Sequence, residues 1–242
     1  MFEQSLLNAL YLIPFLGSVA VAAVVPAGRS PEFYRRWALG LSSLPLIAAL
    51  HLVYTFVQAG SAADAGGPYT VNFSWFRVQD LEVRYALFID GLSLPLVLIA
   101  ALLVPIGIAH SRVEERPREY YALCLLAEGA WIGTFLAGDF FLFSVFWTAS
   151  LVPVSFLIGL QGGPEREYAA GRFFLYGLAG SVTMILAGIW LSTAVPVGTL
   201  LLRSLPGQPF LPGMPEVVPA ALARAPELRP LALAAWWGLF LA

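Results

Sequence analysis

FFLFSVFWTASLVPVSFLIGL, residues 140–160, is a run of 21 residues without a single charged side chain. The hydrocarbon core of a bilayer is about 30 Å thick, and about 20 helical residues cross it at a rise of about 1.5 Å each. A stretch this long and this apolar therefore predicts a membrane-spanning helix.

The composition of the whole chain supports the same interpretation. Of the 242 residues, 59% are hydrophobic and 12% are charged, and the mean hydropathy is +0.79. A soluble domain of this length needs more charge to cover its surface, so the lipid bilayer is the expected surrounding. The 13 basic residues are all arginine and the net charge is −2, which gives no indication of nucleic-acid binding. The single cysteine, Cys124, excludes an internal disulfide and a cysteine metal site.

Six segments are long and apolar enough to span a bilayer, which predicts an all-α integral membrane protein. They are residues 6–25, 38–57, 92–109, 120–137, 140–160 and 173–195. Only Gly138 and Asp139 separate the fourth segment from the fifth, so these two helices should form an antiparallel pair in direct contact.

The distribution of arginines predicts the direction of the helices. The loops after the first, third and fifth segments hold eight of the 13 arginines, whereas the opposite side holds five, mostly in longer loops. By the positive-inside rule, the N-terminus should lie outside and these three loops in the cytoplasm.

The expected division of the chain is helices 1 and 2 in residues 1–60, an external loop in 61–90, helices 3 to 6 in 91–195, a proline-rich external loop in 196–230 and the start of a truncated seventh helix in 231–242. That last apolar run is 12 residues, about 18 Å of helix, which is too short to cross a membrane. A β-hairpin is expected in the first external loop. Residues 71–75, VNFSW, alternate apolar with polar side chains, residues 83–89 are rich in β-formers, and the turn should fall at 77–82.

Glu128, near the middle of the fourth helix, is the most informative single residue. A carboxylate at the bilayer centre costs about 2.5–3.5 kcal/mol on insertion scales, so it should face protein or water. No arginine lies inside any complete span, and the cost of burying a charge therefore favours the neutral acid. Glu128 is either a proton-relay carboxyl or a neutral acid that makes one hydrogen bond between helices.

Other polar residues have simpler structural explanations. Asp90 and Asp139 precede helices and are typical N-caps. Arg172 is expected as a snorkelling charge at the membrane interface, His51 as a hydrogen-bonded interior side chain, and His110 as a partner of the last carbonyls of its helix. The sequence contains no motif of a soluble-type active site, and two histidines make a weak case for a metal.

Four stretches in order resemble one known family. They are FIDGLSLP at residues 88–95, REYYALCLLAEG at 118–129, GDFFLFSVFWTASLVP at 138–153 and GGPEREYAAGRFFLY at 162–176. Their order and spacing are similar to the N-terminal half of chain M of bacterial NADH:quinone oxidoreductase, respiratory complex I. The resemblance covers residues 85–195 strongly and the first 84 residues in hydropathy only.

This resemblance implies an antiporter-like subunit of the membrane arm, in the bacterial inner membrane, that contributes to proton translocation. Its partners would be other membrane-arm subunits and the lipid bilayer. The chain itself would hold no cofactor, because flavin, iron–sulfur clusters and quinone belong to other subunits of the family's complex. Beside Glu128, the candidate supporting residues in the sequence are Asp139, Arg172 and His51.

The sequence departs from the family pattern at two places. The glutamate on helix 5 of the family is replaced by Thr148, whose hydroxyl cannot take a charge at physiological pH. The family's lysine on helix 7 has no counterpart, because the chain contains no lysine. Three hypotheses follow: a subunit that takes part in proton translocation, a scaffold subunit that does not conduct, and a subunit of a multi-subunit cation/proton antiporter or a membrane hydrogenase.

Overall fold

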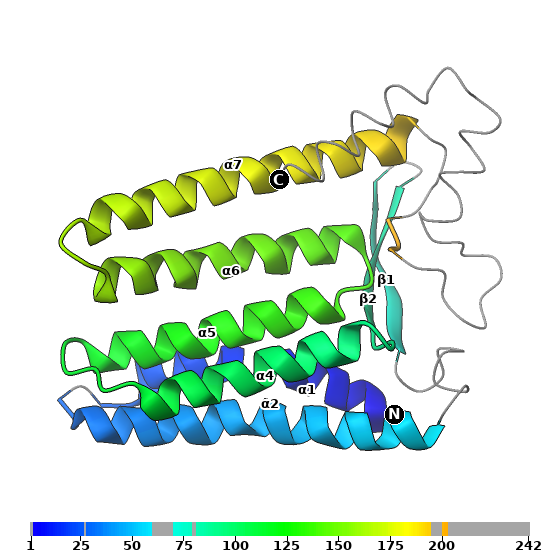
Figure 1. Ribbon diagram of the computed structural model, residues 1–242. Helices are drawn as coiled ribbons and strands as arrows, with labels where there is room; N and C mark the ends of the chain where they lie inside the picture. Colours follow the sequence, from blue (N-terminus) through cyan, green and yellow to red (C-terminus); the bar gives the residue numbers. More distant parts are fainter. Residues whose placement is uncertain (1, 27, 60–69, 79–80, 195–199, 203–242) are drawn as a thin grey trace.

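The computed structural model describes residues 2–26, 28–59, 70–78, 81–194 and 200–202. Within these residues, long helices lie side by side and a two-stranded sheet crosses one end of them (Figure 1). The elements are α1 (Phe2–Val19), its π-helical continuation η1 (Ala20–Val24), α2 (Pro31–Ala59), β1 (Thr70–Val78), β2 (Leu81–Phe88), α4 (Ser93–His110), α5 (Pro117–Leu136), α6 (Phe140–Gln161) and α7 (Arg166–Ala194). The predicted helical membrane fold with a hairpin is confirmed.

Five of the six predicted spans are helices long and apolar enough to cross a membrane: α1 with η1, α2, α4, α6 and α7. The sixth, α5, is also 20 residues long, but its glutamates and tyrosines lower its hydropathy. The structure gives the reason, since α1, α2, α4 and α6 all pack against α5 and 11 of its residues are buried. A helix enclosed by other helices does not need an apolar exterior.

The outer faces of the bundle are apolar, as a lipid surrounding requires. Large hydrophobic side chains are exposed along α1, α2, α4 and α7, among them Leu16, Leu103 and Leu175. Soluble monomers rarely expose so many large apolar side chains. The helices also extend beyond the apolar runs. For example, α2 begins at Pro31, where proline suits the first helical position and Glu32 suits the first turn.

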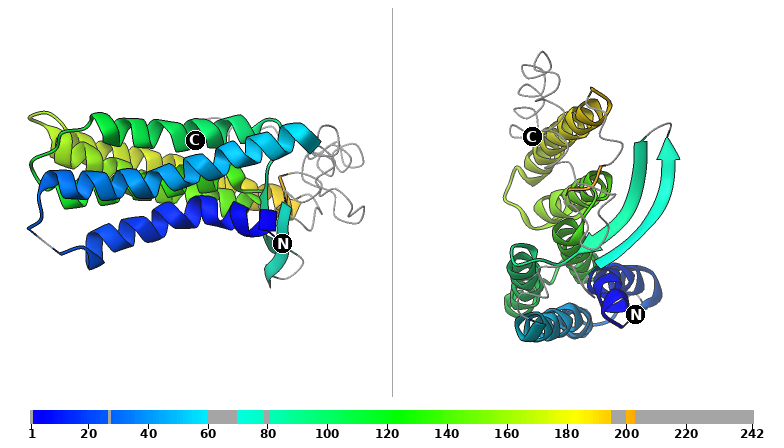
Figure 2. Two further views of the ribbon diagram at one scale, coloured as in Figure 1. Left: turned by 90° about the horizontal axis from the view of Figure 1, so that it is seen from below. Right: turned by 90° about the vertical axis from the view of Figure 1, so that its right-hand side faces the viewer.

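Successive helices alternate in direction, so the loops collect at two ends (Figures 1 and 2). We call one end the hairpin end, because β1 and β2 lie there. The opposite end, the arginine end, contains the loops that follow η1, α4 and α6. These loops and the helix starts beside them carry Arg29, Arg35, Arg36, Arg112, Arg116, Arg118, Arg166 and Arg172.

The hairpin is antiparallel, with Val71 opposite Leu87 and Phe73 opposite Tyr85. Its strands are longer than predicted, and the turn placed at 77–82 is wrong in extent. Arg77 pairs with Glu82 across the two strands, at 3.6 Å between side-chain nitrogen and oxygen. Opposite charges directly across an antiparallel pair favour continued strand, which explains why the ladder runs beyond the apolar pattern.

Helices α5 and α6 form the predicted antiparallel pair, and glycine allows their close approach. A Cβ added at Gly133 of α5 would overlap the ring of Phe146 of α6. A glycine also allows the close approach of α7 to α6, because a Cβ added at Gly188 would overlap the ring of Phe140. Most of the predicted loop at 196–230 and the predicted partial helix at 231–242 lie outside the described residues.

Candidate functional site: a buried carboxyl on α5

Glu128 lies near the middle of α5 and has no exposed surface. Among the described residues, neither of its carboxyl oxygens has a hydrogen-bond partner. The neighbouring Gly129 packs against Tyr11 and Phe15 of α1, so this level of α5 is closely surrounded. The predicted enclosure of Glu128 within protein is therefore present, but the predicted single hydrogen bond between helices is absent from the described residues.

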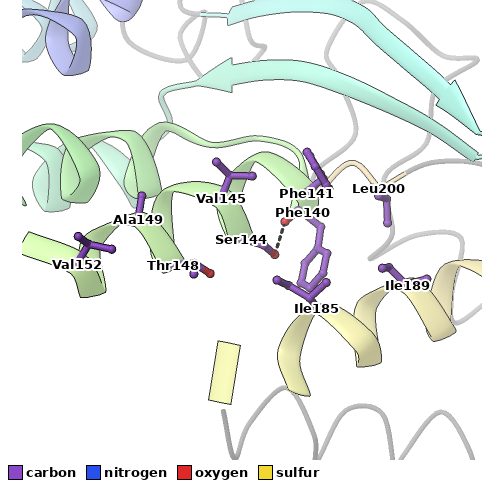
Figure 3. A pocket seen from close by; sticks show the side chains of 10 residues that line it. All are labelled: Phe140, Phe141, Ser144, Val145, Thr148, Ala149, Val152, Ile185, Ile189 and Leu200. Carbon is purple, nitrogen blue, oxygen red and sulfur yellow. Dashed lines mark hydrogen bonds between the residues drawn. The ribbon is translucent and has the colours of Figure 1, made fainter. Parts of the chain in front are cut away.

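Thr148 on α6 lies beside a different environment, an apolar cavity of about 380 Å³ between α6 and α7 (Figure 3). Ile185 and Ile189 of α7 line the opposite side, and Leu200 lies at the hairpin end. Ser144 donates its hydroxyl to the carbonyl of Phe140 at 2.7 Å, which leaves it no proton to offer the cavity.

The Thr148 hydroxyl is buried and has no hydrogen-bond partner within the described part of the chain. The cavity beside it contains no acid or base among its lining residues. An isolated hydroxyl in apolar surroundings can hold a water but carries no charge, so this place on α6 offers no ionisable group.

Asp139 is fully buried at the turn between α5 and α6, and it caps α6 as predicted. Its carboxylate accepts the backbone N–H of Phe141 at 2.8 Å and that of Arg84 at 3.3 Å. Burial raises the pKa of the Asp139 carboxyl, while these hydrogen bonds and the charge of Arg84 act in the opposite direction. Asp90 also caps as predicted, since it accepts the N–H of Ser93 at 2.7 Å.

A polar cluster that was not predicted from the sequence fixes the hairpin to the bundle. Arg84 is largely buried, and its guanidinium bonds Glu82 at 2.7 Å and Asn72 at 2.8 Å. The side chain of Tyr85 donates to Asn8 of α1 at 2.6 Å and lies 2.6 Å from the hydroxyl of Tyr11. Glu82 and Arg84 are two residues apart, so in a strand their side chains point to the same face. This spacing was the only indication of the cluster in the sequence.

The remaining supporting residues do not gather around Glu128. The Arg172 guanidinium lies 4.1 Å from the ring centre of Tyr168, one helical turn away on α7, and is exposed. His51 is on the exposed side of α2, so the expectation of an interior histidine is wrong for this chain. His110 contacts the carbonyl of Ile106 at 2.9 Å, which confirms its predicted place at the helix end. Among the described residues, no three histidine, cysteine or acidic side chains could hold a metal together.

These features define a helical membrane protein with a bundle of spanning helices, a closely packed pair joined by a two-residue turn, and an acid enclosed at its centre. Residues 137–208 match the protein family described as "NADH:quinone oxidoreductase/Mrp antiporter, TM".

Curated relatives specify the resemblance further. The chain is 34% identical over 184 residues to "NAD(P)H-quinone oxidoreductase chain 4 1" of Synechococcus sp. (strain JA-2-3B'a(2-13)), which covers 76% of this chain and 33% of the relative. It is 36% identical over 188 residues to "NADH-quinone oxidoreductase subunit M" of Rhodobacter capsulatus, covering 76% of this chain and 35% of the relative. The predicted resemblance to chain M is confirmed, and this chain spans about a third of the length of these relatives.

Solved structures of related complexes contain chains with a similar fold. A chain of "Respiratory complex I from Thermus thermophilus with bound NADH" superposes with a TM-score of 0.65 at 28% identity, covering 81% of this chain and 38% of that one. A chain of the Mrp complex from Dietzia sp. DQ12-45-1b gives a TM-score of 0.63 at 19% identity, over 95% of this chain and 23% of that one. The second likeness concerns the fold alone.

Proposed function

We propose that the chain is a membrane-arm subunit of a proton-translocating NADH:quinone oxidoreductase, similar to chain M, and that Glu128 takes part in moving protons. The names of its relatives and the likeness to a complex I chain support the assignment to this kind of assembly. The observation that carries the role of Glu128 is its complete burial without a described partner for either carboxyl oxygen.

An unpaired buried carboxyl is costly, and a protein without a use for it gains stability by replacing it with an apolar residue. A neutral carboxylic acid can release its proton, and the carboxylate that remains can accept one, when water or a partner group reaches it, whereas a leucine can do neither. The site on α5 therefore has the chemistry of a relay, even though α6 lacks the acid that the resemblance leads us to expect at position 148.

The same assignment implies a membrane in which the chain lies and other subunits with which it assembles. The chain would lie in the inner membrane of a bacterium with its N-terminus outside, because the arginine end would face the cytoplasm. Other membrane-arm subunits would cover part of the exposed apolar surface. Flavin, iron–sulfur clusters and quinone would be held by those partners, and this chain would bind none.

Substitution of Glu128 by glutamine in the intact complex tests the relay. Glutamine keeps the size and polarity of the side chain but cannot exchange a proton, so proton translocation per electron should fall by at least tenfold while the complex still assembles. The measurement is acidification of closed membrane vesicles during NADH oxidation, with Glu119→Gln at the exposed start of α5 as the control. Unchanged translocation in the Glu128→Gln complex would refute the relay.

A scaffold role is the second candidate, and the apolar cavity beside Thr148 favours it. In that case the chain occupies a place in the membrane arm, and its loss removes the whole complex rather than only proton translocation. A complex that assembles and translocates protons equally well with Glu128→Gln and Glu128→Leu would support the scaffold.

A subunit of an antiporter or of a membrane hydrogenase is the third candidate. The matched family description and the Mrp-like fold favour the antiporter. Purification of the native assembly separates the assignments. Flavin and iron–sulfur absorbance together with NADH oxidation supports the oxidoreductase. Their complete absence supports the antiporter, and iron–sulfur absorbance with hydrogen turnover supports the hydrogenase.

A further inference from the structure

A pocket of about 380 Å³ lies at the arginine end, where the start of α2, the segment after α4 and the start of α5 meet. Small-molecule sites usually measure about 300–1,000 Å³, so this pocket has room for a ligand of several atoms. Tyr121 of α5 is almost completely buried in its wall. The Ser111 hydroxyl donates to the carbonyl of Ile108 at 2.8 Å and lies 3.3 Å from the Tyr121 hydroxyl. These contacts hold the segment after α4 against the helices, so this wall of the pocket is preformed.

Charges of both signs line this pocket. Arg35 and Arg112 supply two positive charges, and Glu32 and Glu114 supply two negative ones. Glu32 forms an exposed ion pair with Arg36 at 3.7 Å. Among the described residues, the two arginines of the pocket and Glu114 form no ion pair. The pocket therefore keeps two cations and one carboxylate available for a ligand.

The surroundings of Arg35 indicate what kind of ligand this is. Its Nε atom is buried and has no hydrogen-bond partner among the described residues. A buried charged donor without an acceptor is costly, and a guanidinium binds phosphate oxygens through two parallel hydrogen bonds. The pocket also includes Pro31 and Glu32, the first residues of α2, and the helix dipole favours an anion there. These features favour a phosphate group beside Arg35.

The apolar surface that continues from the pocket indicates a lipid as the source of this phosphate. Leu39, Leu46 and Leu50 follow Arg35 at spacings of four and seven residues, so they lie on the same side of α2. Leu50 is 52% exposed, and Leu103 of the adjacent helix α4 is 58% exposed. A phospholipid whose headgroup occupies the pocket would lie with its acyl chains on this surface. Basic pockets between spanning helices are known to bind lipid headgroups.

We propose that the pocket binds the headgroup of one phosphatidylethanolamine molecule. Arg35 and Arg112 hold the phosphate, and the Glu114 carboxylate accepts hydrogen bonds from the ammonium. A headgroup with both charges matches a lining with both charges, whereas an anionic headgroup leaves Glu114 without a cation. The inference does not rest on the proposed relay, because Glu128 is not part of this pocket.

Photo-crosslinking in the intact assembly tests this site. We would reconstitute the assembly in nanodiscs of phosphatidylcholine with a small fraction of phosphatidylethanolamine that carries a diazirine near the start of one acyl chain. Adducts located by mass spectrometry should concentrate on residues 39–46 and 103–112. Arg35→Gln should reduce them about fivefold or more, because it removes both the charge and the parallel hydrogen bonds. Arg172→Gln, an exposed arginine at the same end but outside the pocket, should leave them unchanged.

Competition by unlabelled molecules identifies the headgroup. Phosphatidylethanolamine should compete about fivefold better than phosphatidylglycerol, which has the phosphate without an ammonium. Glu114→Gln should remove this preference and keep the labelling, whereas Glu165→Gln, exposed in the loop before α7, should keep both. Inorganic phosphate should not compete, because it has no acyl chains to bind the apolar side of α2.

Four results would overturn the proposal. Equal labelling in the unchanged and Arg35→Gln assemblies, or no adducts at the two segments, would show that only bulk lipid surrounds the pocket. Displacement by inorganic phosphate would assign the pocket to free phosphate, and equal competition by phosphatidylglycerol would exclude the ammonium. If Arg35→Gln does not assemble, Arg112→Gln in the exposed segment gives the same test. Unchanged labelling in that variant would also contradict the site.

Discussion

The middles of α5 and α6 lie at the same depth and differ in almost every other respect. Glu128 is ten residues before Gly138 and Thr148 is ten residues after it, so each lies about 15 Å from the turn that joins the helices. At Glu128 an acid is enclosed without a described partner. At Thr148 an uncharged hydroxyl faces an apolar cavity.

The number of neighbouring helices explains this difference. Four helices pack on α5, so a polar group on it can be shielded from lipid on all sides. On its outer side α6 meets α7, whose membrane-spanning window is only 17% buried. A carboxyl at position 148 would therefore lie near lipid, and depth in the bundle alone does not make a position suitable for an acid.

Substitution of Thr148 by glutamate would copy the family pattern, but we expect it not to increase proton translocation. The new carboxyl would enter an apolar cavity without a cation among its lining residues, and an acid at such depth costs about 2.5–3.5 kcal/mol. Thermal unfolding of the purified complex should show a loss of this size, with Thr148→Gln as the uncharged control. Increased translocation with unchanged stability would show that the cavity is already prepared for an acid.

Substitution of Gly133 tests how closely α5 packs against α6. Alanine at an open helical glycine gains up to about 1 kcal/mol, as expected for Gly107 of α4, where an added Cβ meets nothing within 4 Å. At Gly133 the added Cβ overlaps the Phe146 ring, so we expect Gly133→Ala to lose about 1–3 kcal/mol. Opposite signs of the two changes in denaturation would confirm the contact, and a gain at both positions would contradict it.

Substitution of Tyr85 tests how firmly the hairpin is attached to the bundle near the turn between α5 and α6. Its hydroxyl donates to Asn8, and the hydroxyl of Tyr11 donates to it in turn, so phenylalanine leaves both partners unsatisfied. The expected loss is about 1–2 kcal/mol. Limited proteolysis of the hairpin should become faster in Tyr85→Phe, whereas Tyr54→Phe, on the exposed side of α2, should behave as the unchanged chain does.

The smallest effect concerns the hydroxyl of Thr148 and has the opposite sign. Valine has nearly the same shape and removes a buried donor without a described partner, so Thr148→Val should raise stability by about 0.5–1 kcal/mol. Ser144→Ala, one turn away, removes a hydroxyl that is bonded to the Phe140 carbonyl and should not gain stability. A loss in Thr148→Val would indicate that the hydroxyl holds a water that the protein needs.

Sequence patterns predict the spanning helices, the hairpin, the antiparallel pair at Gly138 and the special position of Glu128. These features follow from local properties: apolar length, residue alternation, a two-residue connection and one acid far from any arginine. The sequence also predicted the caps at Asp90 and Asp139, because a cap depends on neighbours only two or three residues away.

The tertiary structure alone decided which helix lies inside the bundle and which polar groups meet. Three features depend on how whole helices rotate about their axes: the interior place of α5, the exposure of His51, and the attachment of Arg84 and Tyr85 to the bundle. That rotation is set by close contacts such as Gly133 against Phe146. Because these contacts join residues far apart in the chain, no local pattern contains them.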